Sequence, residues 1–181
     1  KLMSALVAEK SYPLNMHTTI SKDAVSQEED SGKLKIGESL TVKELLYIML
    51  IESSNDAAYA LAEIMGVKEF VRQMNKEARL LGLENTFYFD PTGLDPEDQG
   101  RKGPANYSTA EDLANLGKYL LRKPPILDIL RKKEYPLYLL QIPLDPLRVY
   151  HRSWVADAIP LNKILHTDFQ KGNIAISIMV Y

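Results

Sequence analysis

The sequence predicts an α+β fold in which helices cluster on one face of a sheet. The first two thirds of the chain show helical periodicity, with capping patterns and glycines at the ends of the apolar runs. The final stretch, GNIAISIMVY, alternates and is rich in isoleucine and valine. That pattern is typical of a strand buried on both faces. Helices followed by strand material in this order favour a helical cluster packed on a sheet.

Length and composition predict a single domain spanning residues 1–181. The apolar share of 45% and the charged share of 25% are ordinary for a globular protein. A net charge of −2 and the lack of a long basic run argue against a nucleic-acid surface. No apolar stretch approaches the ~18 residues that a membrane helix requires.

Residue usage also excludes several kinds of site. The chain has no cysteine, so it has no disulfide, thiolate nucleophile or cysteine-based zinc site. The histidines, His17, His151 and His166, show no metal-ligand spacing, and no glycine-rich phosphate loop is present. We therefore expect no cofactor. The opening KLMSALVAEK has no cleavage-site pattern, so we expect no signal peptide, and the compartment stays open.

The first part of the chain should be mainly helical. Residues 1–10 have apolar side chains on one helical face, whereas residues 16–40 predict a loop with short extended pieces. Thr41 and Glu44 form a capping-box pattern that opens a helix over VKELLYIMLIE. Ser54 or Asn55 then caps a helix over DAAYALAEIM.

A third helix, KEFVRQMNKEARLLG, is expected to close on its final glycine. The NTFYF segment that follows predicts a short strand, and the Pro/Gly-rich remainder predicts an ordered turn or loop. Ser108 and Glu111 form a second capping-box pattern, opening a helix that Pro124 and Pro125 end. A short helix over ILDILRKKE is expected next, whereas the prolines within residues 135–154 prevent any prediction.

The triplet Ser53-Ser54-Asn55 gathers short polar side chains at a helix–turn–helix corner. Ser53 and Asn55 could face one cleft while Ser54 turns away. A serine can relay a proton there, and a carboxamide can both donate to and accept from a substrate amide. Helix capping alone would also account for these residue types.

Four blocks of the sequence resemble serine-type D-alanyl-D-alanine carboxypeptidases, the low-molecular-weight penicillin-binding proteins. GESLTVKELLYIMLIESSNDAAYALAE resembles the segment around the family's Ser-x-Asn motif, and KLMSALVAEK resembles the nucleophile helix from the lysine of Ser-x-x-Lys onward. NTFYFDPTGLDP and NYSTAEDLANLGKYLL resemble the family's Asn-Thr-x-Phe-x-Asp-Pro-x-Gly-Leu and Tyr-Ser-Thr-Ala-x-Asp-Leu stretches. The match runs in register from residue 1 to about residue 138.

The resemblance implies a fold and three catalytic residues. The fold is the α/β (α+β) penicillin-recognising serine transpeptidase/β-lactamase-like fold, a helical cluster packed on an antiparallel sheet. Lys1 matches the motif lysine, which serves as the base that activates the serine, although that role is disputed in related enzymes. Ser53 matches the serine that passes a proton toward the leaving amine. Asn55 matches the asparagine that holds the substrate amide.

Two parts of the family pattern are missing from the printed sequence. The nucleophilic serine would precede Lys1 by three residues, and Ser4 cannot replace it because Ser4 follows the lysine and is expected to be a packing site. The Lys-Thr-Gly strand also has no match. Its nearest counterpart is HTDF, where Asp168 would repel a substrate carboxylate. We therefore expect the printed sequence to be an incomplete catalytic domain. The missing segments are either left out of the printed sequence or truly deleted from the protein.

The implied reaction is acyl transfer on a peptidoglycan stem peptide ending in D-Ala-D-Ala, with β-lactams such as penicillin as inhibitors. The family has no metal or organic cofactor. It acts outside the cytoplasmic membrane in cell-wall synthesis and cell shape, and a terminal membrane tether is possible. Two alternatives stay open: a serine β-lactamase, which shares the fold, and a non-catalytic module that has lost its nucleophile.

Asp90 and Asp95 could instead suggest paired carboxylates or a calcium loop. Their spacing does not fit an EF-hand loop and no glutamate closes it. We expect these aspartates to form turns.

Overall fold

The structure is a computed structural model, and it describes residues 1–27, 33–96, 102–132, 134–136 and 149–151. The predicted final strand and the HTDF segment lie outside these residues. Within the described ranges, no helix is long and apolar enough to cross a membrane.

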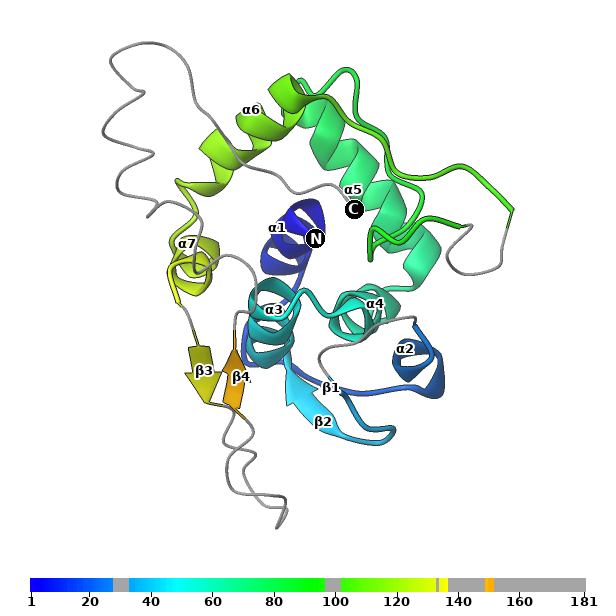
Figure 1. Cartoon of the computed structure of the whole chain (residues 1–181), viewed down its shortest axis with the longest axis vertical. Coiled ribbons are helices and arrows are strands. Elements are labelled where there is room, and N and C mark those ends of the chain that lie inside the picture. The colour runs from blue at the N-terminus through cyan, green and yellow to red at the C-terminus, as the bar shows by residue number, and fades with distance from the viewer. Residues whose placement is uncertain (28–32, 97–101, 133, 137–148, 152–181) are drawn as a thin grey trace.

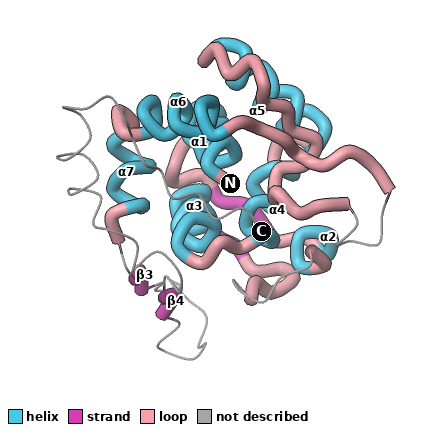
Figure 2. The backbone as a smooth tube through the Cα atoms, turned by 45° about the horizontal axis from the view of Figure 1, so that its top comes forward, coloured by secondary structure: helices cyan, strands magenta, loops and turns pink. Residues whose placement is uncertain are grey.

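Helix α1 lies at the centre of a helical cluster (Figure 1), and Figure 2 shows the same enclosure from another direction. All six side chains from Met3 to Ala8 are buried. Six consecutive positions cover every face of a helix, so the prediction of a single apolar face was wrong. A helix buried on all sides must be enclosed by other elements, which explains the position of α1. Helix α1 spans Leu2–Ser11 and contacts the five other helices of the cluster. These helices are α3 (Val42–Ile51), α4 (Asn55–Glu63), α5 (Val67–Leu80), α6 (Ala110–Leu120) and α7 (Pro124–Leu130).

The predicted capping box begins α3. The Thr41 hydroxyl accepts a hydrogen bond from the Glu44 backbone N–H at 3.1 Å, and the Glu44 carboxylate accepts one from the Thr41 N–H at 2.7 Å. Most apolar side chains of α3 are buried, and Leu45 and Leu46 are fully buried. Since α3 packs directly on α4, this anchored helix fixes the corner that joins the two.

Antiparallel strand pairs flank the cluster. Strand β1 (His17–Thr19) pairs with β2 (Ser39–Thr41), and β3 (Glu134–Pro136) pairs with β4 (Val149–His151). The predicted extended pieces within residues 16–40 are therefore present. The short helix α2 (Lys22–Val25) was not predicted, because one turn is too short to show periodicity.

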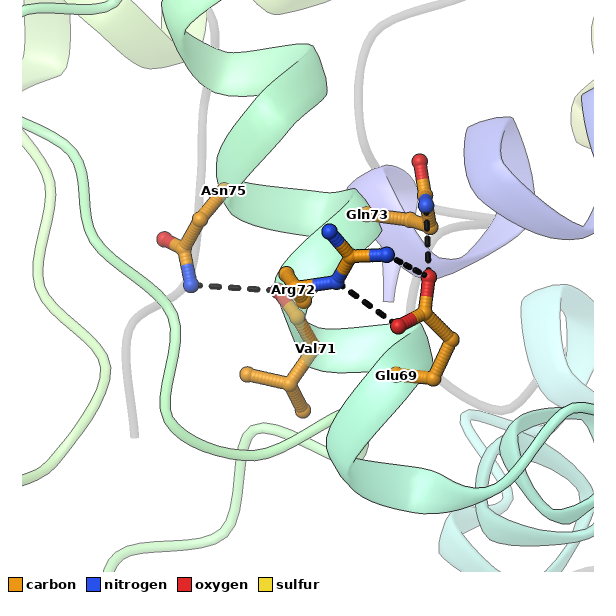
Figure 3. A network of polar contacts seen from close by, with 5 residues as sticks. All are labelled: Glu69, Val71, Arg72, Gln73 and Asn75. Atoms are coloured by element: carbon orange, nitrogen blue, oxygen red, sulfur yellow. Dashed lines mark hydrogen bonds and ion pairs between the residues drawn. The ribbon is translucent and has the colours of Figure 1, made fainter.

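Helix α5 presents different polar groups on two sides (Figure 3). On one side, Glu69 accepts hydrogen bonds from Arg72 and from Gln73, each at 2.7 Å. Asn75 projects from the other side of the helix. The helix ends before Gly82, whose φ of 70° gives the left-handed conformation that terminates helices, as predicted.

Two local predictions were wrong. Helix α6 is capped by Thr109, whose hydroxyl accepts from the Asp112 N–H at 3.2 Å, and Ser108 lies one residue too early to cap it. The NTFYF segment forms a single bridge, in which Phe87 and Tyr107 exchange backbone hydrogen bonds of 3.0 Å. The N–H groups of Asn85, Tyr88 and Phe89 donate to side chains instead, so the segment is not a regular strand.

Helix α7 begins two residues earlier than predicted, at Pro124. A proline is favourable at the first helical position because its missing N–H would have no partner there. The same residue that ends the preceding run therefore opens the next helix.

Candidate active site

Lys1 and Asn55 are brought together although they lie far apart in sequence. Lys1 immediately precedes α1, and Asn55 is the first residue of α4. The Lys1 Nζ donates a hydrogen bond to Asn55 Oδ1 at 2.6 Å and another to the backbone carbonyl of Thr92 at 3.0 Å. Two of the predicted catalytic residues thus share a direct contact at the centre of the molecule.

The α3–α4 corner, residues 52–55, separates its two serines. Ser54 is fully buried and caps α4, accepting a hydrogen bond from the Ala57 N–H at 3.1 Å. Ser53 is exposed and has a φ of 61°, a left-handed conformation that is uncommon outside glycine. Such strain is found where the surrounding structure enforces it, often at functional sites. Ser53 therefore remains the candidate proton relay, and Ser54 has the capping role.

The carbonyl of Thr92 is a site group that the sequence reasoning missed. It belongs to a tight turn within DPTG, in which one Asp90 carboxylate oxygen accepts hydrogen bonds from the Thr92 N–H at 2.7 Å and the Gly93 N–H at 3.2 Å. The Thr92 hydroxyl also donates to this oxygen. The turn-forming role predicted for Asp90 is confirmed. The DPTG pattern could have indicated the turn, but not the direction of its carbonyl.

Ser4 ties the same turn to α1. Its buried hydroxyl donates a hydrogen bond of 2.6 Å to the carbonyl of Pro91 and lies 4.0 Å from the sulfur of Met74. The predicted packing site therefore also anchors a loop. This contact fixes the turn to the helix that begins next to Lys1.

Two asparagines hold the chain that leads into the turn. Asn75 accepts from the Tyr88 N–H at 2.8 Å and donates to the Tyr88 carbonyl at 2.7 Å. Asn106 accepts from the N–H groups of Phe89 at 2.6 Å and Asp90 at 3.0 Å. Because a carboxamide carries both a donor and an acceptor, each asparagine makes the backbone hydrogen bonds that a neighbouring strand would otherwise make.

Lys1 is half-buried at the start of α1, where its amine has polar partners on the α3–α4 corner and on the turn. The described residues contain no cluster of three or more histidine and acidic side chains that could hold a metal ion.

The sequence matches a family model described as "Peptidase_S11: D-alanyl-D-alanine carboxypeptidase" over residues 1–142. A Bacillus subtilis D-alanyl-D-alanine carboxypeptidase, DacF, is 45% identical over 91 residues, which are 49% of this chain and 22% of that protein. A D-alanyl-D-alanine carboxypeptidase from Streptomyces is 32% identical over 151 residues, covering 75% of this chain and 49% of that protein. The chain thus spans half or less of the length of these relatives.

Solved structures of the same kind of enzyme are similar to this chain. A D-alanyl-D-alanine carboxypeptidase from Mycobacterium tuberculosis superposes with a TM-score of 0.74 at 28% identity, covering 85% of this chain and 55% of that one. The Streptomyces K15 DD-transpeptidase gives 0.66 at 31% identity, covering 75% of this chain and 55% of that one. The predicted penicillin-recognising fold, with helices and antiparallel strands, is confirmed by these neighbours.

Proposed function

Because the chain belongs to the Peptidase S11 family of D-alanyl-D-alanine carboxypeptidases, we propose that this protein is a serine-type D-Ala-D-Ala carboxypeptidase. Its substrate is a peptidoglycan stem peptide that ends in D-Ala-D-Ala, and β-lactams are its inhibitors. The observation that carries the proposal is the 2.6 Å hydrogen bond between Lys1 and Asn55, which joins residues of two family motifs in one site.

The reaction proceeds through an acyl-enzyme. A serine hydroxyl attacks the carbonyl between the two D-alanines, and its proton passes to the amine of Lys1. The proton then reaches the leaving amine, D-alanine departs, and water hydrolyses the ester. The resemblance places this serine three residues before Lys1, a position outside the printed sequence. Three residues are close to one helical turn, so the hydroxyl would lie on the same helical face as Lys1.

Asn55 and Ser53 serve the substrate side of the reaction. The Asn55 carboxamide accepts from Lys1 through its oxygen, and its nitrogen is the donor for the substrate amide. Ser53, exposed at the corner, relays the proton toward the leaving amine. Their separation by Ser54 lets one helix cap support both groups.

The remaining expectations follow from this activity. Residues 1–181 belong to one catalytic domain, which requires no metal or organic cofactor. Because its substrate is peptidoglycan, the enzyme acts outside the cytoplasmic membrane. Nucleic acid is not a partner.

The intact mass of the protein, measured before and after incubation with benzylpenicillin, tests the proposal. We expect a rise by one molecule of the β-lactam that persists for hours, and peptide mapping should place it on the serine preceding Lys1. An adduct that is quickly lost with release of hydrolysed penicillin would support a β-lactamase instead. A folded protein that forms no adduct would overturn the enzyme and leave a non-catalytic module.

Replacing the proposed base should slow acylation without unfolding the protein. In Lys1→Ala we expect the rate of adduct formation to fall about 10²- to 10⁴-fold, the usual contribution of a positioned acid–base group. Lys10→Ala is the matched control. This lysine lies on the same helix, but it pairs with Glu77 at 2.7 Å and does not contact the site. Equal rates for both variants would contradict the role given to Lys1.

A further inference from the structure

We propose that Asp90 is a positioning residue that orients the Thr92 carbonyl toward the Lys1 amine. The proposal rests on the function proposed above for Lys1. It assigns to Asp90 a role beyond folding a turn, because the turn carries the Thr92 carbonyl, which accepts a hydrogen bond from the catalytic amine.

The geometry of the peptide unit connects Asp90 to Lys1. The Thr92 carbonyl and the Gly93 N–H belong to one planar trans peptide group, so they point in opposite directions. Asp90 accepts the Gly93 N–H at 3.2 Å, and the Thr92 carbonyl on the other side accepts from Lys1 at 3.0 Å. By holding one end of this peptide plane, the carboxylate directs the other end at the amine.

Neighbouring contacts keep the plane from tilting. Asp90 also accepts the Thr92 N–H at 2.7 Å, and the carbonyl of Pro91 is held by Ser4 at 2.6 Å. Both contacts belong to the Pro91–Thr92 peptide group, so Asp90 and α1 hold this group from opposite edges, and Asp90 holds the next group through the Gly93 N–H. Gly93 has a φ of 88°, which allows the chain to leave the turn without strain.

The chemistry explains why this carbonyl matters. A neutral lysine amine has two N–H groups and one lone pair, and the lone pair is the base. When Asn55 Oδ1 and the Thr92 carbonyl accept the two N–H groups, the direction of the lone pair is determined. Loss of one acceptor lets the amine rotate about its terminal bond. The base would then spend much of its time facing away from the hydroxyl, a misalignment that can cost 10²-fold in rate.

The variants Asp90→Ala and Asp90→Asn distinguish the effect of losing the turn's hydrogen bonds from the effect of losing the negative charge. Asparagine retains the side-chain oxygen that accepts the turn's N–H groups, whereas alanine removes it. We expect Asp90→Ala to lower the rate constant of acylation by benzylpenicillin about 10- to 100-fold at unchanged non-covalent affinity. Asp90→Asn should retain the parent rate within about 3-fold, by the same argument from its acceptor. Asp95→Ala, at an exposed position of the same loop, is the control and should be unchanged.

Two results would overturn the proposal. Asp90→Ala acylating at the parent rate would show that the turn does not position Lys1. Equal slowing in Asp90→Ala and Asp90→Asn would assign the effect to charge.

A second measurement does not depend on acylation. Nuclear magnetic resonance of the Lys1 side-chain nitrogen should detect protons protected from water in the parent and in Asp90→Asn, but not in Asp90→Ala. Parent protein with protected protons and no β-lactam adduct would refute the carboxypeptidase and keep the positioning role. Unprotected protons in the parent would refute the positioning role itself.

Discussion

The α3–α4 corner and the loop of residues 86–93 hold the same lysine by different means. The corner offers a side-chain acceptor, Asn55 Oδ1, and its position is set by two buried helices packed on each other. The loop offers a backbone acceptor, the Thr92 carbonyl. Its position is set by hydrogen bonds that the loop makes with the side chains of Asp90, Ser4, Asn75 and Asn106.

A site residue can thus be held by apolar packing of helices, as at the corner, or by polar side chains that bind the backbone, as in the loop. Apolar packing is distributed over many contacts, so no single polar side chain holds the corner in place. The loop instead depends on individual polar side chains, and removal of one leaves backbone groups without partners. The loop should therefore be the more fragile support of Lys1.

The largest effect on stability is expected for Asn75→Ala. The change leaves the N–H and the carbonyl of Tyr88 without their side-chain partners, which should lower the free energy of unfolding by about 2–3 kcal/mol. Gln73→Ala, on the opposite side of the same helix (Figure 3), removes a local contact with Glu69 and should stay within about 0.5 kcal/mol. Urea unfolding measures the free energy of unfolding of both variants. Equal losses in the two variants would show that helix α5 itself, rather than its link to the loop, had been weakened.

A smaller effect is expected at the corner. Ser54→Ala removes the N-cap of α4 and should cost about 1 kcal/mol in urea unfolding. Ser53→Ala changes an exposed hydroxyl and should alter stability by less than about 0.5 kcal/mol, while slowing acylation if Ser53 relays the proton. The reverse order of stability would exchange the roles of the two serines.

The smallest effect is expected in alkaline solution, through the ring of Tyr88, which packs inward from the loop. Burial, and secondly the Asp112 charge, raise the pKa of Tyr88 to about 12. An unfolded tyrosine ionises near pH 10, so this contribution to stability is complete below about pH 10 and is lost as the pH rises toward 12. At pH 10.5 the loss should be below about 1 kcal/mol.

Tyr88→Phe checks this contribution, because phenylalanine keeps the ring but cannot ionise. The alkaline slope of unfolding free energy should be shallower in the variant than in the parent. Burial also raises the pKa of Tyr12 to about 12, so some slope should remain. An unchanged slope would mean that the Tyr88 hydroxyl is solvated.

Local signals in the sequence were sufficient for most of the helices. The capping box of Thr41 and the cap at Ser54 act over three residues, so they can be read directly from neighbouring letters. The cap of α6 was misplaced by one residue because Ser108 and Thr109 both fit the pattern. In the structure Ser108 instead lies 2.7 Å from the Thr86 hydroxyl, a contact that only the fold creates.

The candidate site was predictable only where a motif marked it. Lys1, Ser53 and Asn55 were found through a resemblance, and the structure brings Lys1 and Asn55 into contact. The Thr92 carbonyl carries no side-chain signature, since every residue has the same backbone group. The asparagines that support it lie 13 and 16 residues from their partners, beyond the range of a capping pattern.

The hydrogen bonds from Lys1 to Asn55 and to the Thr92 carbonyl also decide when the Lys1 side chain loses its conformational freedom. A lysine side chain gives up about 1.5–2 kcal/mol of rotamer entropy when it is fixed in one conformation. Here the corner and the loop fix Lys1 in the resting protein, so this loss falls on folding and does not recur in each catalytic cycle. A flexible base would have to be ordered again for every substrate molecule, whereas this one meets each substrate already aligned.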